Sequence, residues 1–179
     1  MRIIAGRYQR RALHAPSGRN TRPTADRTRE AIFNLLQSRF HLNDAHVLDL
    51  FAGSGALGLE ALSRGASSST FVESDPGAVR TIHQNITSLG VVDETDVLRM
   101  DVLKYLLRPS RRFDLVFADP PYILGLLPTL PTQMLNVTEP EGYAVLEHDK
   151  RHTFEHHPGW VLSRPYGRTT VSLFEHPTE

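Results

Sequence analysis

One stretch of the chain decides its fold: Val47-Leu48-Asp49-Leu50-Phe51-Ala52-Gly53-Ser54-Gly55-Ala56-Leu57-Gly58-Leu59-Glu60-Ala61. It begins with an apolar run typical of a buried strand and continues into a turn rich in glycine. Apolar residues at Leu57, Leu59 and Ala61 then indicate a helix. Glycines let a ligand approach the backbone closely, and a helix N-terminus offers free N–H groups. The stretch therefore predicts a strand, a ligand-binding loop and a helix in succession.

The glycine spacing is compatible with two kinds of ligand. Gly53, Gly55 and Gly58 fit the pattern G-x-G-x-x-G, and Glu73 follows the first glycine by 20 residues, at the end of another apolar run. This is the fingerprint of dinucleotide binding, in which the acid binds the ribose hydroxyls. Asp49 stands just before the loop, however, where it would repel a pyrophosphate and attract a cation. S-adenosylmethionine carries a sulfonium, an ammonium and no phosphate, so the charges favour it over NAD.

A second motif, Asp119-Pro120-Pro121-Tyr122, ends the apolar run 113–118. The carboxylate can accept a hydrogen bond from an amine, and the prolines remove two backbone donors, so that nearby carbonyls can point at a ligand. The tyrosine ring offers a face on which a base can stack. An acidic turn closed by prolines is the plainer interpretation. Together with the glycine loop, the motif favours a site for an exocyclic amino group on a planar ring.

Positive charge is concentrated at the N-terminus. The chain has no net charge, but residues 1–40 contain nine arginines, no lysine and two acids, a local charge of +7. Arginine suits forked contacts to phosphate and stacking on bases. A solvated arm that aids solubility is the alternative, although it does not explain the clustering. We predict RNA contacts for six of the arginines: Arg2, Arg7, Arg10, Arg11, Arg22 and Arg27.

Apolar runs alternate with helical patterns along most of the chain, which predicts a parallel sheet with helices on both faces. The expected strands are 46–51, 69–73, 96–100, 113–119 and 142–147, and the expected helices are 56–64, 76–89, 102–107 and 125–136. A hairpin or extended segment over 2–15 and a helix over 25–39, capped by Thr24, precede them. A hairpin of 160–162 and 170–174 closes the chain. Ligands bind at the C-terminal ends of parallel strands, where four acids are expected: Asp49, Glu73, Asp101 and Asp119.

Three smaller predictions concern polar residues outside the two motifs. Asp75-Pro76 is expected to start a helix. Asp101 either contacts the adenine amino group or caps the following helix, and Val102 is expected to pack on the adenine ring. The four histidines of one late cluster lack the spacing of metal ligands, so we expect exposed side chains at His148, His152, His156 and His157.

Composition narrows the classes of protein. The 179 residues fall within the range of one domain, and a hydrophobic content of 40% argues against disorder. The absence of cysteine excludes disulfides, thiol catalysis and cysteine-ligated zinc. No apolar run approaches the length of a membrane span or of a signal-peptide core. A compact cytoplasmic protein is the expectation.

The two motifs carry a specific resemblance. Residues 49–55, the acidic end of the next strand and Asp119-Pro120-Pro121-Tyr122 resemble the class I S-adenosylmethionine-dependent methyltransferases that modify exocyclic amines. Residues 1–7, 22–34 and 164–174 narrow the likeness further, because they are similar to the bacterial 16S ribosomal RNA guanine-N2 methyltransferase family called RsmD. The likeness covers nearly the whole chain and is weaker at 88–96 and 149–163.

The resemblance implies a Rossmann-like α/β fold with a seven-stranded, mostly parallel sheet, helices on both faces, an antiparallel C-terminal hairpin and a small N-terminal hairpin and helix. It implies an RNA-binding extension over 1–40 and a methyltransferase domain over 41–179. The expected protein is a monomer that needs no metal or membrane and methylates 16S rRNA or the assembled small subunit. The cofactor residues would be Asp49, Phe51, Ala52, Gly53, Ser54, Gly55, Glu73, Ser74, Asp101 and Val102. The catalytic residues would be Asp119, Pro120, Pro121 and Tyr122.

Three alternatives stay open at this point. An adenine-N6 methyltransferase acting on DNA or RNA would use the same Asp-Pro-Pro-Tyr chemistry on another base. An NAD-dependent oxidoreductase is disfavoured by Asp49. A non-catalytic RNA-binding or ribosome-assembly factor is disfavoured by the intact Asp119 and glycine loop.

Overall fold

The computed structural model describes residues 1–16, 23–121 and 125–177, and residues 23–25 by their backbone alone. Two of the predicted site residues, Arg22 and Tyr122, lie outside the described residues.

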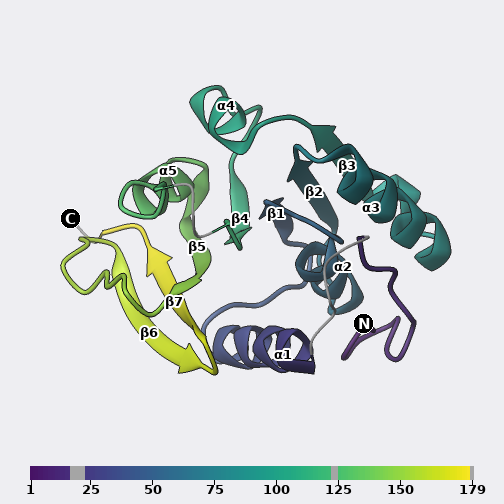
Figure 1. Ribbon diagram of the computed structural model, residues 1–179, viewed down its shortest axis with the longest axis horizontal. Coiled ribbons are helices and arrows are strands. Elements are labelled where there is room, and N and C mark those ends of the chain that lie inside the picture. Colours follow the sequence, from purple (N-terminus) through teal and green to yellow (C-terminus); the bar gives the residue numbers. More distant parts are fainter. Residues whose placement is uncertain (17–22, 122–124, 178–179) are drawn as a thin grey trace.

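A seven-stranded sheet forms the centre of the molecule (Figure 1). Its strands are β1 (His46–Leu50), β2 (Ser68–Glu73), β3 (Thr95–Arg99), β4 (Phe113–Ala118), β5 (Thr138–Asp149), β6 (Trp160–Tyr166) and β7 (Thr169–Glu175). Their order is β3-β2-β1-β4-β5-β7-β6. The first five are parallel, and β7 runs antiparallel to both β5 and β6. The predicted mostly parallel sheet and its antiparallel C-terminal hairpin are confirmed.

Helices cover both faces of this sheet (Figure 1). They are α1 (Pro23–Gln37), α2 (Ala56–Ser63), α3 (Pro76–Leu89), α4 (Val102–Leu107) and α5 (Leu130–Asn136), with a 3-10 turn η1 (Val92–Glu94). Apolar residues of α1, α2 and α3 share one buried cluster with Val47, whereas those of α4 and α5 share another with Leu48. Successive residues of β1 thus face opposite layers, because side chains alternate along a strand.

Strand register brings the predicted acids to one edge of the sheet. Leu50 at the end of β1 pairs with Val72 of β2 and with Ala118 of β4, and Ala118 pairs with Leu146 of β5. The residues that follow these positions must therefore lie near one another.

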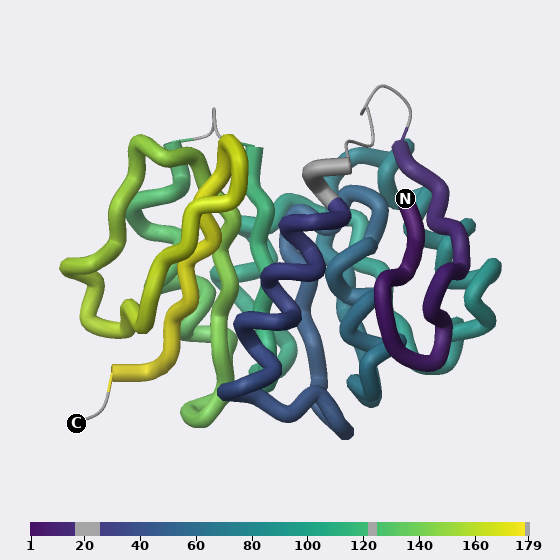
Figure 2. Tube along the Cα trace, turned by 90° about the horizontal axis from the view of Figure 1, so that it is seen from below, coloured from purple at the N-terminus to yellow at the C-terminus, as the bar shows by residue number. Residues whose placement is uncertain are grey.

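Residues 1–16 form a small hairpin on the outside of the sheet domain, drawn in purple in Figure 2. Arg2 and Ala12 form an antiparallel bridge, and the N–H of Leu13 donates to the carbonyl of Met1 at 2.9 Å. Ile3 and Leu13 are buried in the same cluster as α1, α2 and α3. The division of the chain near residue 40 stays a prediction.

Two local predictions were wrong and one is confirmed. α1 begins at Pro23, so Thr24 lies inside the helix and does not cap it. α5 begins at Leu130 and not near 125, with a proline in its first turn, where the missing N–H does no harm. Asp75 caps α3 as expected, accepting a hydrogen bond from the N–H of Ala78 at 2.7 Å.

Candidate active site

The loop between β1 and α2 is fixed by Asp49. This side chain is 2% exposed, and its Oδ2 accepts a hydrogen bond from the N–H of Gly58 at 3.0 Å. Gly53 and Gly55 have φ angles of 59° and 76°, a region that favours glycine. Gly58 is needed for packing, because a Cβ there would lie 2.3 Å from Ser69 Oγ. The glycine pattern thus combines two turn positions with one close approach of α2 to β2.

Glu73 holds this loop against the end of β2. Its Oε2 accepts a hydrogen bond from the N–H of Gly53 at 2.9 Å, and its Oε1 accepts one from Asp75 at 2.8 Å. Each carboxylate oxygen can accept a second hydrogen bond. The predicted contact with ribose hydroxyls therefore remains open to Glu73, but the structure adds a loop-positioning role that the sequence did not indicate.

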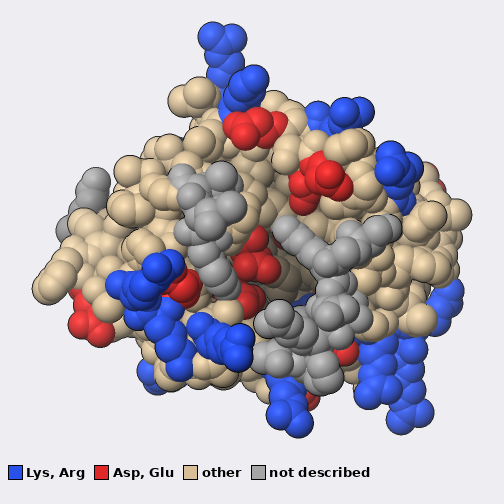
Figure 3. All heavy atoms as spheres, viewed as in Figure 1, with Lys and Arg blue, Asp and Glu red and all other residues tan. Residues whose placement is uncertain are grey.

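A cavity of about 160 Å³ opens beside the loop. Six of the predicted site residues line it: Asp49, Phe51, Ala52, Gly53, Ser54 and Asp119. Six further residues that we did not predict line it too: Met1, Arg29, Ile32, Ala56, Leu57 and Glu147. The cavity gathers residues from β1, α1, α2, the end of β4, β5 and the N-terminal hairpin. Figure 3 shows acidic side chains inside a hollow on the face seen in Figure 1.

The remaining predicted cofactor residues do not line this cavity. Ser74 is exposed beyond β2. Asp101 caps α4, accepting a hydrogen bond from the N–H of Lys104 at 3.0 Å, which establishes the capping role. Val102 is buried in the cluster under α4 and α5. Contacts of Asp101 and Val102 with adenine stay predictions.

The Asp-Pro-Pro motif begins where β4 ends, at Ala118. Asp119 is exposed and reaches the cavity, Pro120 is buried and Pro121 is exposed. Asp119 lies close enough to two other carboxyl groups of the cavity, Asp49 and Glu147, to raise the pKa of both. The motif and the glycine loop thus meet in one site, as predicted from the ends of the parallel strands.

Acidic side chains dominate this cavity. Burial, with smaller contributions from Asp119 and Glu73, raises the pKa of Asp49 to about 8 against the opposing hydrogen bond from Gly58. Burial and then Asp119 raise the pKa of Glu147 to about 7. The three carboxyl groups resist being ionised at the same time, and a bound cation would favour their ionised forms. Glu147 escaped prediction because nothing near it in the sequence marks it as different from other strand acids.

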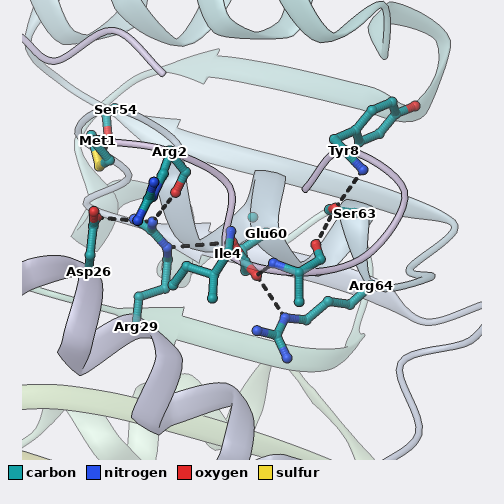
Figure 4. Close-up of polar contacts among 12 residues, drawn as sticks. Met1, Arg2, Ile4, Tyr8, Asp26, Arg29, Ser54, Glu60, Ser63 and Arg64 are labelled. Atoms are coloured by element: carbon teal, nitrogen blue, oxygen red, sulfur yellow. Dashed lines mark hydrogen bonds and ion pairs between the residues drawn. The ribbon is translucent and has the colours of Figure 1, made fainter. Parts of the chain in front are cut away.

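A buried ionic network joins the N-terminal hairpin, α1 and α2 (Figure 4). Glu60 is 0% exposed and accepts hydrogen bonds from the N–H groups of Ile4 at 2.8 Å and Ala5 at 3.0 Å and from Arg64 Nε at 2.8 Å. Arg29 Nε lies 3.6 Å from Glu60 Oε2. Arg29 Nη2 donates to the carbonyl of Arg2 at 2.5 Å and to Asp26 Oδ1 at 3.1 Å.

The N-terminal arginines fall into two groups. Arg7 forms an ion pair with Glu94, and Arg11 donates to the carbonyl of Ser88, so both hold the hairpin against the α3 and η1 region. The other described members of the predicted RNA-binding set, Arg2, Arg10 and Arg27, line a second hollow of about 630 Å³. That hollow also contains Asp26 and Glu30.

The prediction of exposed histidines holds for His156, whereas His152 and His157 are half-buried and His148 is buried. His148 is 1% exposed, and its Nε2 lies 2.7 Å from Ser172 Oγ. It belongs to β5, whose length the sequence underestimated, and it faces a layer that covers it. Among the described residues no group of three His, Cys, Asp or Glu side chains is placed to hold a metal ion. The helices described here are also all too short or too polar to cross a membrane.

Comparison with known proteins places the chain in a family. Residues 1–175 match the family model described as "Conserved hypothetical protein 95". The ribosomal RNA small subunit methyltransferase D of Escherichia coli (strain K12) is 38% identical over 143 residues, which cover 80% of this chain and 69% of that protein.

Solved structures agree with this placement. The yhhF protein of Escherichia coli superposes with a TM-score of 0.85 at 31% identity, covering 100% of this chain and 99% of that one. The Thermus thermophilus 16S rRNA N2 G1207 methyltransferase, RsmC, solved with AdoMet and guanosine, has a TM-score of 0.70 at 21% identity, over 89% of this chain and 44% of that one. This second likeness shows the fold alone. The chain therefore has the class I methyltransferase fold and belongs to the RsmD family of methyltransferases.

Proposed function

We propose that this protein transfers the methyl group of S-adenosylmethionine to the exocyclic N2 of a guanine in small-subunit ribosomal RNA. One observation carries the proposal: Asp49 beside the glycine loop and Asp119 after β4 line one cavity, in which three acids outnumber a single arginine among the described lining residues. The name of the Escherichia coli relative, a small-subunit rRNA methyltransferase, supports methyl transfer to that RNA.

The residues present fit a cationic donor. Asp49 would face its ammonium and sulfonium groups, and the loop from Phe51 to Ser54 would lie against it. The cavity of about 160 Å³ suits the methionine end only. The nucleoside would then extend along the ends of β2 and β3, where Glu73 and Asp101 lie. When bound, S-adenosylmethionine supplies an already activated methyl group.

Asp119 provides the chemistry on the acceptor side. A guanine N2 is a poor nucleophile because its lone pair is delocalised into the ring. The Asp119 carboxylate and a carbonyl of the proline segment would accept hydrogen bonds from its two N–H groups and favour the pyramidal form. Once N2 carries the methyl group, one of its protons would pass to the exposed Asp119 carboxylate and on to solvent. Tyr122, outside the described residues, would stack the base. Positioning in line with the methyl group supplies much of the acceleration. A paired guanine must be flipped out, or be a loop base, to reach this site.

Product analysis tests the acceptor. We expect N2-methylguanosine when the protein, S-adenosylmethionine and small-subunit RNA or particles from cells lacking the protein are combined, digested and analysed by mass spectrometry. N6-methyladenosine in its place would identify the protein as an adenine methyltransferase. Absence of any methylated nucleoside, although RNA binds, would favour the non-catalytic assembly factor.

Cofactor choice is tested by calorimetry. We expect S-adenosylhomocysteine to bind and NAD not to bind, because a pyrophosphate would lie among the acids Asp49, Asp119 and Glu147. Glu73→Ala should weaken binding by roughly 1–3 kcal/mol, the scale of hydrogen bonds to a charged group. Glu73→Gln, which keeps one acceptor for the Gly53 N–H, should lose less, and the exposed Glu141→Ala serves as the control. NAD binding without S-adenosylhomocysteine binding would refute the proposal.

The arginines of the second hollow are expected to bind RNA phosphates. Replacing Arg2, Arg10 and Arg27 together with alanine should weaken RNA binding and flatten the log–log salt dependence by about 0.7–0.9 per lost contact. S-adenosylhomocysteine affinity should not change, because these residues do not line its cavity.

A matched triple variant separates this effect from a general loss of positive charge. Arg80, Arg99 and Arg108 are exposed and lie on α3, β3 and after α4, so their replacement should leave the salt dependence nearly intact. Equal slopes for the two triple variants would show that the hollow is not the RNA-binding surface.

A further inference from the structure

Arg29 is the one cation among the described residues that line the cavity beside the glycine loop, which we call the methyl-donor cavity. Its side chain is 4% exposed, so it lies at the inner wall and not at the mouth. The other charged residues that line the cavity are the acids Asp49, Asp119 and Glu147. A single guanidinium in an otherwise acidic cavity marks the place where an anionic group of a ligand is tolerated.

The protein holds Arg29 by only part of its donor set. Both hydrogen bonds that it makes to described residues leave from Nη2, toward the carbonyl of Arg2 and Asp26 Oδ1. Nε faces Glu60 Oε2 at 3.6 Å without forming a hydrogen bond. A guanidinium has five N–H donors in a planar fork, and no described residue accepts a hydrogen bond from Nη1. Burial lowers the pKa of Arg29 despite the nearby Glu60 and Asp26, so another anion would stabilise its charge.

The glycine loop and the first turn of α2 use several of their N–H groups within the protein. Those of Ala52 and Gly55 donate to the carbonyls of Val72 and Ala52, at 3.2 and 2.7 Å. Those of Gly53 and Gly58 donate to Glu73 and Asp49. Four of the donors that the sequence suggested for a ligand are therefore used within the protein.

The methionine end of S-adenosylmethionine carries two opposite charges, an ammonium and a carboxylate. Asp49 suits the ammonium, but a carboxylate beside Asp49, Asp119 and Glu147 requires a cation. We propose that Arg29 binds the carboxylate of the methyl donor through its guanidinium, and that the N-terminal hairpin holds it in place through the carbonyl of Arg2. This inference rests on the proposed function and names the residue that selects donors with an α-carboxylate.

Arg29 links the N-terminal hairpin to the helix that follows the glycine loop. Met1 lines the cavity together with Ser54 of the glycine loop, and Arg29 connects Arg2 of the hairpin with Glu60 of α2 (Figure 4). Arg29 is a binding and positioning residue by this assignment. It does not touch the reacting nitrogen, so its loss should act on donor affinity and on KM for the donor.

Calorimetry with three adenosine thioethers tests the assignment. S-adenosylhomocysteine has both charges, its decarboxylated analogue lacks only the carboxylate, and 5′-methylthioadenosine lacks both. Wild-type protein should bind S-adenosylhomocysteine about 10- to 100-fold more tightly than the decarboxylated analogue, the range for a charge-assisted hydrogen-bonded pair. Arg29→Met should remove this preference by weakening S-adenosylhomocysteine alone, and Arg29→Lys should keep part of it.

Arg64→Met is the matched structural control. It removes another guanidinium bonded to Glu60 but does not touch the cavity, so its effect should be equal for all three ligands. An Arg29→Met variant that weakens all three ligands equally, or none, would overturn the assignment.

The wild-type measurement covers the case in which Arg29→Met fails to fold. Equal wild-type affinities for S-adenosylhomocysteine and its decarboxylated analogue would then overturn the role of Arg29 and leave the proposed function intact. A wild-type protein that binds none of the three ligands would overturn the proposed function and this inference with it.

Discussion

We expect Asp119→Ala to lower the turnover of methyl transfer by at least about 100-fold, while affinity for S-adenosylhomocysteine stays nearly unchanged. The expected loss has the scale of removing one positioned proton acceptor or electrostatic stabiliser from a reacting group. Asp119 follows β4 at the cavity edge, opposite the glycine loop, and is assigned to the acceptor amine. Its charge also raises the pKa of Asp49, so its removal makes Asp49 easier to ionise and should not harm donor binding.

Two measurements check this prediction: single-turnover methylation of small-subunit RNA and calorimetry with S-adenosylhomocysteine. Asp96→Ala, which removes an exposed acid on β3, is the control and should retain both properties. Full activity in Asp119→Ala would contradict the mechanism. A large loss of donor affinity would instead assign Asp119 to the donor site.

Asp49→Asn should weaken S-adenosylmethionine binding by about 10- to 100-fold, and should weaken S-adenosylhomocysteine less, because the latter lacks the sulfonium charge. Asparagine has nearly the same size and can still accept the hydrogen bond from the Gly58 N–H. The substitution thus removes the charge with little change in loop geometry. Equal losses for the two ligands would show that Asp49 acts on the loop and not on the cation.

The same variant gives a pH dependence with a defined sign. The pKa of Asp49 is about 8 in the free protein, and a bound cation favours the ionised form, so wild-type affinity should rise with pH between 6 and 8. The side chain introduced by Asp49→Asn cannot ionise, so the affinity of this variant should change less with pH. Parallel affinity curves for the two proteins would contradict a titrating Asp49.

Stability without ligand should follow the opposite trend. The folded pKa of about 8 lies above the ordinary value of 3.8, so the folded protein holds the Asp49 proton more tightly than the unfolded chain does. Ionisation is then costlier in the folded state, and wild-type stability falls as pH rises from about 4 to 8. Asp49→Asn lacks this loss, so its stability relative to wild type should increase toward pH 8, which chemical denaturation at several pH values measures.

Features that are local in the sequence were predictable. The β1–α2 unit, the cap of α3 by Asp75 and the end of β4 before Asp119 all follow from short patterns, because hydrophobic period, turn chemistry and capping act between close neighbours. The meeting of Asp49 and Asp119 also followed, since parallel strands place their C-terminal ends at one edge. The seven-stranded sheet came from the family resemblance, and its strand order came only from the structure.

Other features depended on contacts between distant segments. The sequence shows Glu60 as one acid in a helix, yet packing buries it under the N-terminal hairpin, 55 and 56 residues away. The sequence does not distinguish the nine N-terminal arginines from one another. In the folded protein Arg7 pairs with Glu94, Arg29 is buried and Arg10 lines the second hollow. His148 was expected at the surface and is covered by β7 and its neighbours.

The sequence by itself determined the strand–loop–helix unit and the acids at the ends of the parallel strands. Only the tertiary structure decided which charges share the cavity, because it brings Met1, Arg29 and Glu147 to the residues that the motifs mark. The physical reason is that the residues of a motif act on near neighbours along the chain. The burial of Asp49 and Glu147 depends instead on every segment packed around them, and burial is the main cause of their raised pKa values.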